Sequence, residues 1–155
     1  MSQVEVVPFS PELAPEFERI NRAWIETLFR LEPADEEVLR APEQIVENGG
    51  VILFARRSNR IVGTVALIRL EEDVFEIAKM GVDPDHRGAG IGDSLMRAII
   101  EEAVRRGARL LKIETNSVLE PALRLYRRHG FVEQRSATSK HGYARADVFL
   151  ERVLG

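Results

Sequence analysis

The sequence predicts an α/β domain built around one mixed β-sheet. Three strand-like runs, at residues 51–57, 61–70 and 74–82, are separated only by short polar turns, which indicates an antiparallel meander. A strongly amphipathic segment from Ile91 and a strand-like run at residues 110–114 then complete a strand–helix–strand unit. Such a unit favours a right-handed crossover and a parallel pair of strands. The 155 residues are expected to form a single domain, residues 1–155.

Composition excludes several classes of function. With 45% hydrophobic residues and a net charge of −3, the chain can bury a sizeable core and carries no basic stripe for nucleic acid or polybasic membrane anchor. The absence of cysteine excludes disulfides, thiolate metal sites and a cysteine nucleophile. The histidines, His86, His129 and His141, are scattered, so no metal site is expected. Residues 1–5 lack a signal-peptide pattern and no apolar run could span a bilayer, so we expect a soluble cytoplasmic protein without membrane partners.

The N-terminal third reads as a strand followed by two helical regions. After a short strand at residues 4–8, Ser10 and Pro11 form a good helix start, and Glu32–Pro33 is expected to end that helix. A second helical region covers residues 35–48, with an interruption at Pro42 and a stop at two glycines. The first helix carries one apolar face, on which Trp24 is expected to be a core residue rather than a platform for a ligand. The members of this face are Leu13, Phe17, Ile20, Trp24 and Leu28.

A glycine-rich turn at residues 86–92 is the most informative stretch. It lies between a strand-like run and a helix start, where the first N–H groups have no internal partner and the helix dipole favours anions. Arg87 adds a guanidinium that can grip a phosphate in two places, so the turn is predicted to hold a pyrophosphate. The alternative is a left-handed glycine turn that only reverses the chain.

Spacing separates this turn from two common phosphate loops. A Walker A loop needs Gly-Lys-Ser/Thr at its end, but Asp93 and Ser94 follow Gly92. A dinucleotide fingerprint needs a third glycine where Asp93 stands. The pattern that fits is Arg-x-x-Gly-x-Gly, formed by Arg87, Gly90 and Gly92.

The C-terminal part predicts a second crossover helix and two more strands. The helix that starts at Ile91 ends at Gly107, and a helix within residues 116–129 ends at Gly130. The start of that second helix is ambiguous, because Ser117 and Glu120 match a capping box whereas Pro121 favours a start with proline at the first position. Residues 131–135 and 146–153 read as strands, joined by a polar loop at residues 136–142.

A second motif follows the glycine turn in the sequence. Residues 125–131, with Leu125, Tyr126, Gly130 and Phe131, match the pattern Leu-Tyr-x-x-x-Gly-Phe. The two motifs, in this order and at this separation, resemble the hallmarks of the GNAT superfamily of N-acetyltransferases, in particular its small bacterial and archaeal members. The resemblance covers most of the chain, from the strand at residues 74–82 to the final strands.

The resemblance implies a GNAT fold with helices on both faces of a mixed sheet that splits open near the end of the strand at residues 74–82. The pantothenyl arm of acetyl-CoA, the acyl donor, would enter the split, and the pyrophosphate would lie on the N–H groups of the glycine turn. In many family members an asparagine stands three positions before Ala122, but here the residue is Leu119. The cofactor-binding residues implied are Met80, Gly81, Val82, Arg87, Gly88, Ala89, Gly90, Ile91, Gly92, Asp93, Asn116, Ala122 and Tyr126.

Transfer of an acetyl group from a thioester to an amine needs a proton acceptor and a proton donor. By the resemblance Tyr126 lies near the sulfur, and a phenol with a pKa of about 10 can protonate the departing thiolate; alternatively Tyr126 is a core residue. Glu76, on the same strand face as Met80, could deprotonate an ammonium directly or through water, or could be a solvated edge residue. Glu114 is a weaker candidate. Asn116 follows the central parallel strand, where ligands collect in open sheets, although Asn-Ser is also an ordinary turn.

The acceptor is not specified by the motifs. The acids of the first two helical regions, among them Glu32 and Asp35, could attract a cationic primary amine of a small molecule or peptide, or could be solvated. Tyr143 and Arg145 are possible acceptor contacts, and an arginine there would suit a carboxylate. The function predicted is therefore an acetyl-CoA-dependent N-acetyltransferase; the alternative is a non-catalytic sensor or interaction domain that binds acyl-CoA. A homodimer through the final strands is an expectation by analogy alone.

Overall fold

The computed structural model describes residues 3–135 and 137–155 and contains one seven-stranded sheet in the order β1-β2-β3-β4-β5-β7-β6. Every neighbouring pair is antiparallel except β4 and β5, which are parallel, so the predicted meander and parallel pair are confirmed. The strands are β1 (Val4–Pro8), β2 (Val51–Arg57), β3 (Arg60–Arg69), β4 (Val74–Val82), β5 (Leu110–Thr115), β6 (Val132–Gln134) and β7 (Val148–Val153).

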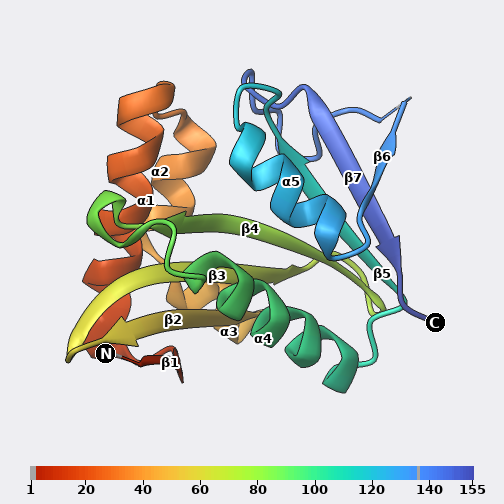
Figure 1. The fold of residues 1–155 in the computed structure, drawn as a ribbon. Coiled ribbons are helices and arrows are strands. Elements are labelled where there is room, and N and C mark those ends of the chain that lie inside the picture. The colour runs from red at the N-terminus through yellow and green to blue at the C-terminus, as the bar shows by residue number, and fades with distance from the viewer. Residues whose placement is uncertain (1–2, 136) are drawn as a thin grey trace.

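Helices cover both faces of the sheet, as Figure 1 shows. Strand β2 is buried on both sides because its side chains alternate between two cores. Ile52 and Phe54 pack with the first three helices, whereas Leu53 and Ala55 pack with the last two. The helices are α1 (Ala14–Leu28), α2 (Pro33–Arg40) and α3 (Glu43–Glu47) on one face, and α4 (Ile91–Arg105) and α5 (Glu120–Arg128) on the other, with short 3₁₀ turns η1 (Pro11–Leu13) and η2 (Pro84–His86).

Two predicted helix boundaries in the N-terminal third are wrong. Ser10 precedes the 3₁₀ turn η1 and its side chain caps nothing, so α1 begins only at Ala14. Pro33 does not end the first helix but begins α2, because a proline at the first helical position needs no N–H donor. Glu32 and Asp35 cap this start reciprocally, and the Glu32 N–H donates to Asp35 Oδ2 at 2.9 Å.

The apolar face of α1 is only partly a core face. Phe17 and Ile20 are buried, but Trp24 is partly exposed and Leu28 is 52% exposed. The C-terminal half of α1 lies over the end of β4, where the sheet opens, so the expectation that Trp24 is a core residue is wrong. Instead, the side chains of Trp24 and Leu28 line a cleft.

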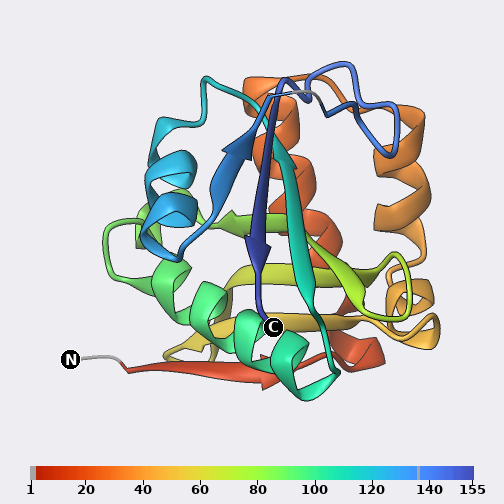
Figure 2. The same cartoon turned by 90° about the vertical axis from the view of Figure 1, so that its right-hand side faces the viewer.

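The sheet splits where β4 and β5 diverge. The two strands pair only from Val74–Glu76 to Leu110–Lys112. Beyond that point β5 and β7 run steeply across the direction of β2 to β4, which Figure 2 shows with the teal and blue strands upright over the yellow ones. A bulge adds to the divergence: the register of β3 and β4 shifts near Thr64, and Lys79 has a positive φ of 52°. A non-glycine residue with positive φ is uncommon outside turns and functional sites.

The start of α5 follows neither predicted alternative. Leu119 is the residue before the helix, and Pro121 is its second residue. The Ser117 hydroxyl and N–H instead donate to Asp147, at 3.1 and 2.9 Å, which ties this turn to the segment before β7. The predicted final strands are present as β6 and β7; Ser136, the first residue of the predicted loop, lies outside the described residues. Among the described helices, none is long and apolar enough to cross a membrane.

Candidate active site

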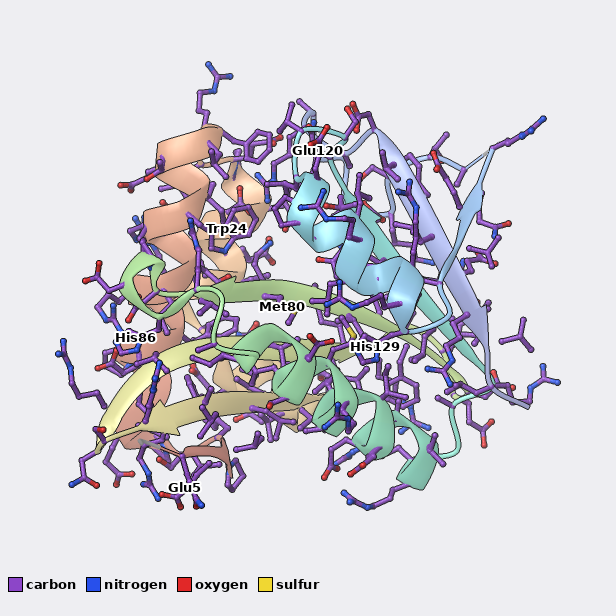
Figure 3. All side chains as sticks on the ribbon, in the orientation of Figure 1. Glu5, Trp24, Met80, His86, Glu120 and His129 are labelled. Atoms are coloured by element: carbon purple, nitrogen blue, oxygen red, sulfur yellow. The ribbon has the colours of Figure 1, made fainter. Side chains whose placement is uncertain are left out.

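A cleft of about 860 Å³ lies where β4 and β5 diverge. Its size is within the range of small-molecule and cofactor sites. At one end it is lined by the turn before α4, at the other by the loop at residues 137–147, and α1 and α5 flank it. Figure 3 labels Trp24 on α1 and Met80 on β4, two of the side chains that line it.

The glycine turn has the form of an anion site. Gly88 and Gly90 have positive φ values of 80° and 77°, and a Cβ at either position would meet no atom within 4 Å. The turn is therefore open, and its backbone can approach a ligand closely. The first bond of α4 runs from the Ser94 N–H to the Gly90 carbonyl at 3.1 Å, so earlier N–H groups of this terminus face outward without helical partners. Arg87 is exposed beside them and lines the cleft.

Asp93 fixes this turn against α5. Its carboxylate accepts hydrogen bonds from Arg128 at 3.0 Å and pairs with His129 at 2.9 Å. The hydrogen bond with His129, together with Arg128, lowers the pKa of Asp93. The negative charge next to the turn is thus paired with the Arg128 guanidinium, which limits its repulsion of an anion.

Nearly all the predicted cofactor residues come together. The cleft is lined by Met80, Gly81, Val82, Arg87, Gly88, Gly90, Ile91, Gly92, Asp93, Asn116, Ala122 and Tyr126, whereas Ala89 is outside the lining. Gly81 has a packing role that the sequence did not reveal. A Cβ there would lie 2.7 Å from Trp24 Cδ1 and 2.9 Å from Ile20 Cγ2, so glycine is needed for α1 to approach β4.

Tyr126 borders the cleft from α5. It is 8% exposed and packs edge-on to Phe131 at 6.4 Å. No hydrogen bond to its hydroxyl occurs within residues 3–135 and 137–155, and the hydroxyl is not among the fully buried unpartnered atoms, so it opens to the cleft. Burial raises the pKa of Tyr126 to about 12, above the value of about 10 expected from the sequence. The phenol therefore stays protonated at neutral pH, as a proton donor must.

Asn116 is occupied by the protein itself. Its side-chain amide donates to the Arg145 carbonyl at 2.7 Å, and its Oδ1 accepts the Val118 N–H at 2.8 Å. Asn116 thus joins the start of the α5 turn to the segment before β7. These contacts fit the turn-forming alternative, although the residue also borders the cleft.

Glu76 lies at the vertex of the split, in the last residue pair between β4 and β5. It is 2% exposed, and His141 Nε2 lies 2.6 Å from its Oε1. The alternative that Glu76 is a solvated edge residue is therefore wrong. Glu114 accepts hydrogen bonds at 2.7 Å from the Ser139 hydroxyl and the Lys140 N–H, so it anchors the same loop that carries His141.

Glu76, Glu114 and His141 form the one group in the described part of the chain that could offer metal ligands, with ligand atoms within 4.8 Å of one another. Glu76 Oε1 is paired with His141, and both oxygens of Glu114 accept hydrogen bonds from the loop that carries His141. We therefore interpret the group as a hydrogen-bonded cluster of the cleft.

A buried charge cluster beside Glu76 was not predicted. Asp35 is fully buried and accepts from Arg145 at 2.6 and 2.8 Å, and Lys79 Nζ lies 3.1 Å from it. Lys79 also donates to the Tyr143 hydroxyl at 2.9 Å, and Arg145 lies over the Tyr143 ring. Burial lowers the pKa of Lys79, although the charge of Asp35 opposes this effect. No periodicity or spacing joins Asp35, Lys79 and Arg145 in the sequence, so only folding brings them together.

The cluster corrects the role expected of Arg145. Its guanidinium is already bound to Asp35 and lies 3.3 Å from Glu32. Because two carboxylates neutralise it, Arg145 is not free to bind a carboxylate of the acceptor. Arg145 instead holds the loop to α2.

Comparisons with known proteins agree with this geometry. The model of the "Acetyltransferase (GNAT) family" matches residues 15–131. An IAA acetyltransferase of Azospirillum brasilense is 32% identical over 125 residues, which cover 80% of this chain and 81% of that protein. A mycothiol acetyltransferase of Actinosynnema mirum is 32% identical over 98 residues, covering 63% of this chain but only 33% of that longer protein.

Solved structures show the same fold. A GNAT-family acetyltransferase of Staphylococcus aureus superposes with a TM-score of 0.89 at 21% identity, covering 99% of this chain and 100% of that one. A phosphinothricin acetyltransferase of Sinorhizobium meliloti, in complex with acetyl-CoA, has a TM-score of 0.79 at 19% identity, covering 98% and 89%. With the split sheet, the glycine turn and the family match over most of its length, the chain belongs to the acetyltransferase (GNAT) family, whose acyl donor is acetyl-CoA.

Proposed function

We propose that residues 1–155 form one domain that transfers the acetyl group of acetyl-CoA directly to a primary amine of a small molecule or peptide. The observation that carries the proposal is the continuity of the cleft, which joins the open glycine turn to Tyr126 and to the buried carboxylate of Glu76. A domain that only bound acyl-CoA would need the turn but no proton-transfer groups deeper in the split.

The glycine turn and the end of β4 are proposed to bind acetyl-CoA. The pyrophosphate is proposed to lie on the N–H groups from Arg87 to Gly92, and the pantothenyl arm along Met80 to Val82. The divergence of β5 supports this assignment, because it leaves the facing edge of β4 without a strand partner after Glu76. Strand N–H groups there can bind the oxyanion of the tetrahedral intermediate without reorganising.

Tyr126 is proposed to donate a proton to the departing thiolate. Its hydroxyl has no competing partner among the described residues and is held by a helix, which favours precise placement. A pKa of about 12 makes full transfer to an exposed thiolate unfavourable. The sulfur would be desolvated in the same cleft, however, and desolvation raises the pKa of a thiol as it does that of a phenol.

The acceptor end is negatively charged. Glu32, Asp35, Glu76 and Glu114 lie there or support its walls, while Arg145 and Lys79 are engaged with Asp35. This balance supports a cationic amine as acceptor, with Glu76 taking part in removal of its proton, directly or through a neighbour. The exposed apolar surface of Leu28 and the partly exposed Trp24 would contact the body of that acceptor.

The proposal is tested by calorimetric titration with acetyl-CoA, followed by a thiol-release screen against a panel of primary amines. Binding together with thiol release on at least one amine is expected. Absence of binding would refute the assignment of the glycine turn. Binding without release on any amine would favour the sensor function instead. The predicted homodimer is tested separately by light scattering at several protein concentrations.

A further inference from the structure

We propose that His141 is the residue that accepts the proton of the acceptor amine, and that Glu76 acts through it as a positioning residue. This inference rests on the proposed acetyl transfer to an amine. It assigns the role of general base to a loop residue for which the sequence analysis predicted no function.

The geometry separates the two roles. Glu76 is 2% exposed, so an ammonium can hardly reach its carboxylate, and Oε1 is already in contact with His141 at 2.6 Å. The side chain of His141 is 30% exposed and borders the cleft. A carboxylate can only accept a hydrogen bond, which assigns the proton of the neutral imidazole to Nε2. The lone pair of Nδ1 is then available, and no residue in the described ranges hydrogen-bonds it.

The loop is built to hold His141 in place. Ser139 and Lys140, directly before it, bind Glu114 on β5, and Tyr143, directly after Gly142, binds Lys79 on β4. The His141 ring also packs against the Tyr143 ring at 5.7 Å. Anchors on both sides of one exposed imidazole would be unusual for a solvated surface loop, which normally varies in conformation.

The charges around His141 increase the basicity of its imidazole. The hydrogen bond and charge of Glu76 raise the pKa of His141, as does Glu114, whereas burial and Lys79 act in the opposite direction. Tyr143 adds a neutral hydroxyl on the same side. A carboxylate that orients a histidine and increases its basicity is a recurring arrangement in acid–base sites.

The proton movements balance. The ammonium of the acceptor gives one proton to His141 Nδ1, and the neutral amine then attacks the thioester carbonyl, forming the C–N bond. Collapse of the tetrahedral intermediate breaks the C–S bond, and the thiolate takes the proton of Tyr126. The second proton lost by the amine nitrogen restores the Tyr126 hydroxyl, and His141 releases its proton to water. One amide, one thiol and one proton result.

The test compares kcat/KM across pH for the wild type, His141→Ala, Glu76→Gln and the control Glu72→Gln, which lies in the exposed turn before β4. For His141→Ala we expect kcat/KM to fall by roughly 10²-fold or more and the acidic limb of its pH profile to disappear. Added imidazole should partly restore the rate. Glu76→Gln should retain more activity than His141→Ala and move the acidic limb to lower pH, because the imidazole remains but loses its carboxylate. Glu72→Gln should match the wild type.

The opposite ranking would overturn the inference. If His141→Ala keeps the rate and pH profile of the wild type, His141 is not the base. If imidazole restores nothing while Glu76→Gln is the more damaging change, Glu76 is the direct base. Acetyl-CoA titration of each variant separates this from loss of folding or cofactor binding. A wild type that releases no thiol with any amine would instead refute the proposed function itself.

Discussion

Removal of the Asp35 charge should be among the most destabilising single changes in this chain. Asp35 is 0% exposed, and its carboxylate faces Arg145, whose side chain is 13% exposed, and Lys79, whose side chain is 6% exposed. It also accepts the Glu32 N–H in the capping box of α2. Asp35→Asn keeps the volume but replaces one acceptor oxygen with an N–H donor that faces other donors. Among the described residues, Arg145 then keeps only Glu32 as a carboxylate partner, and Lys79 keeps the neutral Tyr143 hydroxyl.

The magnitude follows from these contacts. Breaking a buried ion pair by removing one partner costs about 3–5 kcal/mol. For a domain of this size, each kcal/mol lowers Tm by about 2–4 °C, so the expected decrease is roughly 6–20 °C. Thermal unfolding followed by circular dichroism measures it. The matched control is Glu37→Gln, the same chemical change at an exposed position of α2, which should stay within about 0.5 kcal/mol of the wild type.

The effect should also depend on pH. Burial alone would raise the pKa of Asp35, but hydrogen bonds from Arg145 and the Glu32 backbone, with the charge of Lys79, hold that pKa below its usual value. Because the pKa is lower in the folded state, the stabilisation is present above the unfolded pKa of about 3.9 and is lost as pH falls through the folded pKa. The Tm difference between wild type and Asp35→Asn should therefore persist from about pH 5 to 7 and narrow below about pH 4. A variant that melts within about 2 °C of the wild type at pH 7 would refute the reasoning.

Three further predictions concern the donor half of the cleft. Gly90→Glu should abolish acetyl-CoA binding in calorimetric titration. The control Gly107→Glu should bind acetyl-CoA normally, because Gly107 has a matching φ of 79° and equally open space at the other end of α4. Equal loss of binding in both variants would implicate backbone strain alone. Tyr126→Phe should lower kcat but leave acetyl-CoA affinity and Tm nearly unchanged, since the Tyr126 hydroxyl has no partner among the described residues. An unchanged kcat would remove Tyr126 from the mechanism. Gly81→Ala should destabilise the fold by about 1–3 kcal/mol and shift the fluorescence of the single tryptophan, because the new Cβ would lie 2.7 Å from Trp24. A variant with the Tm and emission of the wild type would show that α1 can move aside.

Local sequence patterns determined most of the fold. The alternation in β2, the period of α4 and the glycine stops are signals that span a few residues, so β2 and β4 have the predicted bounds. Local sequence also carries the proposed donor site, because the glycine turn is one contiguous segment whose spacing alone separates it from other phosphate loops. At Pro33 the prediction failed because a proline can either end a helix or begin one. At Pro121 both predicted starts failed because the capping residues and the proline indicate different first positions.

Only the tertiary structure decided the acceptor half of the site. His141 meets Glu76 across 65 positions of sequence, and Arg145 meets Asp35 across 110. Pairing of buried charges depends on which surfaces the folded sheet brings together, and no local period encodes it. The same reason explains Trp24, whose helical spacing marked it as core although α1 overhangs the opened end of β4. The sequence by itself thus indicated the family, the acyl donor and the sheet, while the contacts of the proposed proton acceptor and the charge pairing in the proposed acceptor pocket depend on long-range packing.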